Sequence, residues 1–136
     1  MIDREIAARA RELVEAQRQN TADHELETKY RSLCETLPIL LRTAGLTRTV
    51  TFLDAKKAKD NHPKNEQDWV LSHLQDQLQA SGLYTDASQR TLDLPRFATT
   101  RELPLERYRY AAGLAFRVAY WHKRMAQALL RTREGA

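Results

Sequence analysis

Apolar residues recur every three or four positions through most of this 136-residue chain, and that spacing limits its fold more than any other feature. An α-helix turns about 100° per residue, so residues at such steps share one face and can be buried together. No stretch alternates apolar and polar residues for long, as a strand would. With only four glycines and four prolines to interrupt the pattern, the sequence predicts an all-α fold.

The pattern divides into a compact bundle of five to six helices. We expect helices at about residues 3–20, 23–44, 65–80 and 104–131, another beginning at 46, and a short one at 88–94. Asp3 should cap the first helix, and Pro38 should kink or break the second. Gly45 should end that helix, and Pro104 should begin the last. We see no linker or internal repeat, so residues 1–136 are predicted to form a single helical-bundle domain.

The C-terminal helix carries an apolar sector wider than a surface helix needs. This sector contains Leu105, Tyr108, Ala111, Ala112, Ala115, Val118, Ala119, Met125, Ala126, Leu129 and Leu130, with Trp121 at its edge. We therefore expect a long central helix that packs on several sides. The narrow remaining sector contains Arg109, Gly113, Arg117, Tyr120, Arg124, Gln127 and Arg131.

Positive charge is concentrated in two segments of a mildly basic chain. The net charge is +4, but residues 103–136 carry +5 and residues 42–59 carry +4, which leaves −5 for the remainder. Such an uneven distribution indicates a local site for a polyanion rather than nonspecific electrostatic binding over the whole surface.

The polar sector of the last helix is the first candidate for that site. Arg117, Arg124 and Arg131 are seven residues apart, so they lie almost in line. Such a row could follow the phosphates of a nucleic-acid backbone, and each guanidinium could donate two hydrogen bonds to one phosphate. Tyr120 could stack a base, and a mid-helix Gly113 suggests close approach by a partner. The alternative is an ordinary solvated face.

A second candidate lies in the segment after Gly45. Arg48, Phe52 and Lys56 fall within about a third of a turn of one another, opposite the apolar residues of that helix. They indicate another surface that contacts a nucleic-acid backbone. The alternative is that Phe52 lies in the core and the lysine stems lie along it.

The sequence contains no pattern typical of an enzyme or a metal site. The four histidines have no cysteine or carboxylate at ligand spacing, and there is no phosphate loop or nucleophile motif. Cys34, the only cysteine, is expected to be a buried hydrophobe. We therefore expect no catalytic activity, cofactor or metal. No membrane span or signal peptide is apparent, so we expect a cytoplasmic protein.

Two stretches of the sequence each form an ordered series of short motifs. The first runs Leu37-Pro38-Ile39-Leu40-Leu41, then Gly45-Leu46, then Phe52-Leu53-Asp54-Ala55-Lys56; the second is Tyr108-Arg109 followed by Trp121-His122-Lys123-Arg124-Met125-Ala126. Together they resemble a known family, the small subunit of type III-B (Cmr-type) CRISPR effector complexes. The order and spacing of both match the family. The sequence departs from it at Ala112-Gly113-Leu114, where members often carry a glutamate, and at His122, where they favour leucine.

The resemblance implies a helical, non-catalytic subunit present in several copies. These copies would stack beside the filament of backbone subunits, near the Cas10-type large subunit, and line the channel that holds guide RNA paired with target RNA. RNA cleavage would belong to the backbone subunit. By position, the motifs assign RNA contacts to Lys56, Arg109, Lys123 and Arg124. The positions of basic residues on the helix faces add Arg42, Arg48, Arg117 and Arg131.

Three other functions remain open from the sequence. The nearest is the small subunit of another type III CRISPR effector, which would also be helical and RNA-associated. A helical DNA-binding regulator is a different class, although no clear helix-turn-helix motif with a basic second helix is present. A protein-only adaptor could instead use the arginines to meet acidic partners.

Overall fold

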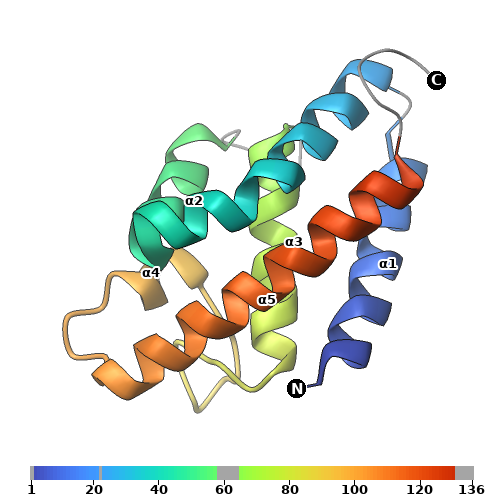
Figure 1. The fold of residues 1–136 in the computed structure, drawn as a ribbon. Helices are drawn as coiled ribbons and strands as arrows, with labels where there is room; N and C mark the ends of the chain where they lie inside the picture. The colour runs from blue at the N-terminus through green and yellow to red at the C-terminus, as the bar shows by residue number, and fades with distance from the viewer. Residues whose placement is uncertain (1, 22, 58–64, 131–136) are drawn as a thin grey trace.

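The protein is a bundle of five α-helices in the part of the chain that the computed structural model describes, residues 2–21, 23–57 and 65–130. The helices are α1 (Asp3–Gln19), α2 (His24–Lys56), α3 (Glu66–Ala80), α4 (Leu94–Ala98) and α5 (Leu105–Leu129). In Figure 1, α5 runs diagonally between α1 and the first half of α2, with α3 behind it. The predicted all-α bundle with a long central C-terminal helix is confirmed.

The long helix α2 consists of two helical halves that meet at Gly45. This glycine has φ 85° and ψ 171°, a conformation that only glycine adopts without strain, so the predicted helix end is confirmed there. Of the kink or break predicted at Pro38, the break is wrong, because the helix continues through this residue; the kink stays a prediction. Pro38 is buried, and the packing of α2 against α3 and α5 offsets the one backbone hydrogen bond that proline cannot make.

Helix α3 has the boundaries that the sequence predicts. Asn65 and Asp68 form a reciprocal capping box at its beginning. At its end, Gly82 has φ 96°, and the Leu83 N–H donates to the Leu78 carbonyl oxygen at 3.3 Å. Leu83 is buried, as expected for the apolar residue that follows a terminating glycine.

The short helix predicted at residues 88–94 is wrong. Residues 85–91 form a turn that is closed by a hydrogen bond from the Thr85 N–H to the Thr91 carbonyl oxygen at 2.8 Å. Helix α4 follows instead, because the Asp93 carboxylate caps it and Pro95 suits its first turn. Two other helix starts differ from the prediction by one residue. The cap of α1 is Ile2, one residue before the predicted Asp3, and α5 begins at Leu105, one residue after the predicted Pro104.

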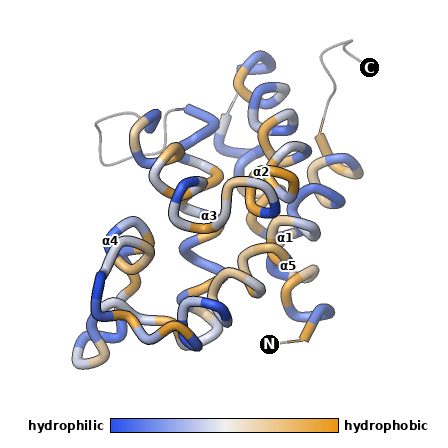
Figure 2. Tube along the Cα trace, turned by 60° about the vertical axis from the view of Figure 1, so that its left-hand side comes forward, coloured by the Kyte–Doolittle hydropathy of each residue, from blue (hydrophilic) through white to orange (hydrophobic). Residues whose placement is uncertain are grey.

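Small side chains bring the neighbouring helices close to α5. Four of its alanines are fully buried, and α5 contacts α1, α2 and α3. Figure 2 shows hydrophobic and hydrophilic positions interleaved along each helix, as amphipathic packing requires. Leu105 was expected in the core but is 61% exposed, because it begins α5 at the edge of the bundle.

Candidate nucleic-acid interface

The solvent-exposed side of α5 carries three arginines in a row. Arg109, Gly113, Arg117, Tyr120 and Arg124 are all exposed, and we call these five residues the α5 stripe. At 1.5 Å per residue, its arginines span about 22 Å along the helix axis. The polar sector predicted from the sequence is thus a continuous surface, with buried residues on the opposite side of the same helix.

Aromatic rings hold two arginines in place at this surface. The Arg124 guanidinium lies over the Tyr120 ring at 5.2 Å from its centroid, and its Nη1 donates to Gln127 Oε1 at 3.2 Å. Arg42, from α2, lies over the Phe116 ring at 5.2 Å. Cation–π contacts of this kind fix the position of a guanidinium while its N–H edge remains able to bind another group. Arg42 thereby joins the surface beside the α5 stripe.

Arg117 is paired with a carboxylate from the other end of the chain. Its Nη2 donates to Asp3 Oδ1 at 2.8 Å, and its Nε donates to the same oxygen at 3.1 Å. Both side chains remain solvent-accessible, at 45% for Arg117 and 61% for Asp3. Asp3 was considered only as a helix cap from the sequence, and no local pattern links it to a residue 114 positions away.

The other predicted contacts lie elsewhere. Arg48 and Lys56 are exposed on the second half of α2, beyond Gly45, beside Phe52. Phe52 is 42% exposed, so the alternative that places it in the core is wrong. Lys123 is on α5 and half-buried, and Arg131 lies outside the described residues.

Several basic side chains that the sequence did not single out support the fold. Arg31 is only 17% exposed; it pairs with Glu35 at 3.2 Å and donates to backbone carbonyls near the end of α5. Arg9 pairs with Asp76, which links α1 to α3. Arg107 donates to the Tyr84 carbonyl oxygen and lies over the Phe97 ring. Their partners give these residues structural roles.

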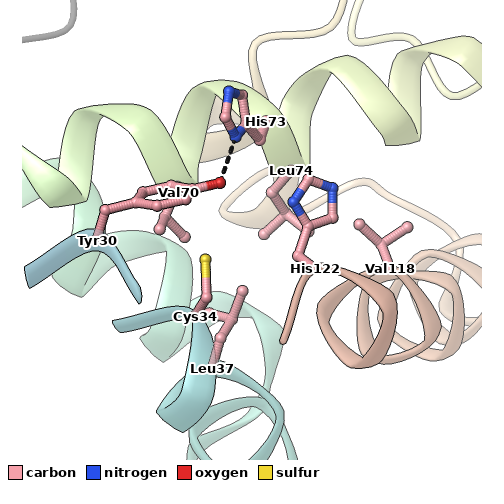
Figure 3. Close-up of a pocket in the computed structure, with 8 residues that line it drawn as sticks. All are labelled: Tyr30, Cys34, Leu37, Val70, His73, Leu74, Val118 and His122. Carbon is pink, nitrogen blue, oxygen red and sulfur yellow. Dashed lines mark hydrogen bonds between the residues drawn. The ribbon is translucent and has the colours of Figure 1, made fainter. Parts of the chain in front are cut away.

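A polar cluster lies at the centre of the bundle, around a cavity of about 10 Å³ (Figure 3). Tyr30 Oη and His73 Nδ1 are hydrogen-bonded at 2.7 Å, while Gln77 Nε2 lies 3.2 Å from His122 Nε2 and donates to the Ile6 carbonyl oxygen. A cavity of this size has room for about one water molecule. We therefore interpret the cluster as part of the core.

Burial governs the protonation of this cluster. Loss of hydration lowers the pKa of His73 to about 4 and, together with the nearby His73, lowers that of His122 to about 3. It also raises the pKa of the Cys34 thiol to about 12. Cys34 is buried, as the sequence predicts. Within the ranges that the structure describes, no cluster of three or more histidines, cysteines or carboxylates is arranged to hold a metal ion.

The fold and the α5 stripe define a small helical protein whose central helix presents arginines to solvent. A family model described as CRISPR-associated protein (Cas_Cmr5) matches residues 2–129, nearly the whole chain. The chain therefore belongs to this family of small subunits of Cmr-type (type III-B) CRISPR effector complexes. The family resemblance inferred from the sequence is confirmed, which decides against the small subunit of another type III effector and against the DNA-binding regulator.

Family membership implies assembly with other Cmr subunits into an effector complex, in which the small subunit is structural. A search of curated proteins finds no match. Among the described residues, no helix is long and apolar enough to span a membrane.

Proposed function

We propose that this protein is a non-catalytic small subunit that stabilises guide RNA paired with target RNA, through the α5 stripe, in antiviral defence. Membership of the Cmr-type small-subunit family supports this proposal. The single structural observation that carries it is the exposed row of Arg109, Arg117 and Arg124 on one face of the central helix.

The proposed contribution is electrostatic. Each arginine that meets a phosphate releases condensed counterions, so binding strengthens as salt is lowered. The planar guanidinium can donate two parallel hydrogen bonds to phosphate oxygens. Pairing between guide and target supplies the sequence specificity, so the protein needs to contact only the backbone and shape of the duplex.

The remaining predicted contacts extend this proposal to both sides of the stripe. Arg42 is the best supported of them, because its contact with Phe116 holds it beside α5. We also assign RNA contacts to Lys123, on α5, and to Arg131, which lies outside the described residues. Arg48 and Lys56 would form a separate contact on the second half of α2.

We further propose that the chain acts as one domain in the cytoplasm. Several copies would stack along the filament of backbone subunits, near the Cas10-type large subunit, and present their α5 stripes to the RNA channel. The chain would take no cofactor, and cleavage of RNA would be carried out by another subunit.

Charge reversal in the assembled complex tests the proposal. The complex is reconstituted with wild-type chain or with Arg117→Glu/Arg124→Glu, and the binding of labelled target RNA is measured over a range of salt concentrations. We expect the variant to bind target RNA more weakly. The slope of log affinity against log salt should flatten by about 1 for each phosphate that the variant no longer binds.

A matched control separates this effect from net charge. Arg90→Glu/Arg96→Glu changes the charge by the same amount at exposed positions outside α2 and α5, and should retain wild-type binding. Circular dichroism of both variants reports whether the helices persist. Equal weakening in both variants, or unchanged binding in the α5 variant, would return the stripe to the role of a solvated face.

A further inference from the structure

We propose that Asp3 is an internal counter-anion which occupies Arg117 and competes with RNA phosphate for it. This inference rests on the proposed function of the α5 stripe and adds a regulation of that surface. It starts from the ion pair between the first residue of α1 and the middle of α5, in which one carboxylate oxygen accepts from both Nε and Nη2 of Arg117.

The pair occupies one of the two guanidinium edges through which Arg117 can bind a phosphate bidentately. Nε and Nη2 form the fork that grips an oxyanion, and Asp3 Oδ1 lies 3.1 and 2.8 Å from them. A phosphate oxygen that approaches this fork must therefore replace the carboxylate. Both side chains are about half exposed, so water can solvate each of them when the ion pair separates. Burial therefore does not prevent a phosphate from replacing the carboxylate.

The packing of α1 keeps Asp3 at this position. Ile6, Ala10 and Val14 on the same helix are fully buried, and α1 packs extensively against α5. The backbone of Asp3 is thus anchored while its exposed side chain can turn. A negative charge in the first turn of α1 is also favoured by the helix dipole.

The competition is confined to one arginine of the stripe. In the part of the chain that the structure describes, no carboxylate forms an ion pair with Arg109 or Arg124, and Arg124 instead contacts the uncharged Gln127 and Tyr120. Phosphates can therefore bind to these two arginines without displacing an acid. Asp3 therefore lowers the affinity of the middle position for phosphate and leaves that of the two outer positions unchanged.

Neutralising Asp3 tests this inference. The full chain is titrated against a short labelled RNA duplex at low salt, where phosphate contacts contribute most, and then at increasing salt. Asp3→Asn should tighten binding by about two- to five-fold, the range expected for release from an exposed ion pair. The salt slope should change little, because Arg117 contacts a phosphate in both proteins.

Two further variants show whether the effect passes through Arg117. Glu5→Gln removes the same charge from an exposed position in the same helical turn, and should tighten binding much less. In the Arg117→Gln background, Asp3→Asn should have no effect. Thermal unfolding of each variant shows that α1 remains docked on α5.

The outcomes separate this inference from the proposed function. If Asp3→Asn and Glu5→Gln act equally, or if Asp3→Asn still tightens binding without Arg117, Asp3 is not a competitor, while RNA binding by the stripe stands. If the wild type and Asp3→Asn both fail to bind the duplex at low salt, and Arg109→Gln and Arg124→Gln change nothing, both the inference and the function of the stripe are wrong.

Discussion

Acid should destabilise this protein through the two buried histidines of the core. His73 and His122 are neutral in the folded protein, because burial lowers the pKa of His73 to about 4 and that of His122 to about 3. In the unfolded chain a histidine has a pKa of about 6.5. Below about pH 6.5 the unfolded state therefore binds protons that the folded state does not, so the free energy of unfolding falls as the pH falls.

The magnitude follows from the width of that interval. One pKa unit corresponds to about 1.4 kcal/mol, so each histidine removes about 2 kcal/mol of stability between about pH 6.5 and about pH 5. The pair together removes about 4 kcal/mol. This is a large part of the roughly 5–15 kcal/mol that stabilises a typical domain. Near pH 4 the loss of stability caused by His73 levels off, because His73 begins to be protonated in the folded state as well.

Urea unfolding followed by circular dichroism at several pH values measures this dependence. The informative variant is His73→Phe/His122→Leu, which should lose most of the slope between about pH 6.5 and about pH 5 whatever its stability at neutral pH. His24→Gln removes an exposed histidine and should retain the wild-type slope. A slope in the double variant as steep as in the wild type would show that carboxylates, and not the buried imidazoles, set the acid sensitivity.

Two other predictions concern the backbone and the thiol. Gly45→Ala should lower the free energy of unfolding by about 1–3 kcal/mol, because alanine is strained at φ 85°. Gly113→Ala should raise the free energy of unfolding by about 0.5–1 kcal/mol, because Gly113 lies on a regular helix with open space around it. Thermal or urea unfolding measures both effects, and equal effects would contradict the assignment of the bend to Gly45. Cys34 should react with a thiol reagent at the rate of unfolding, because the thiol is buried and its pKa is raised to about 12; rapid modification of the folded protein would contradict its position in the core.

Local signals in the sequence were sufficient for most of the fold. Gly45 bends the backbone where the sequence predicts it, because glycine can adopt a positive φ without strain. The errors arose where tertiary packing, or a stronger signal from neighbouring residues, outweighs a local preference. Pro38 remains helical because its segment is buried between other helices, and residues 88–94 do not form a helix because Asp93 and Pro95 start one later.

Only the part of the candidate site that depends on a local pattern was predictable from the sequence. The α5 stripe follows from helical periodicity alone, so Arg109, Arg117 and Arg124 could be placed on one exposed face from the sequence. The contacts that modify the stripe come from other helices: Asp3 from α1, and Arg42 from α2 through Phe116. Contacts between residues so distant along the chain leave no periodic signal in the sequence, so only the three-dimensional packing reveals these contacts.

The two sides of α5 depend on each other. The buried alanines let α1 and α2 approach closely, and these same helices then deliver Asp3 and Arg42 to the edges of the stripe. A looser core would shift both side chains relative to the arginines, even if the helix itself remained intact. The charge that the protein presents to a polyanion is therefore set by how closely its core packs, as well as by the number of arginines on the surface of α5.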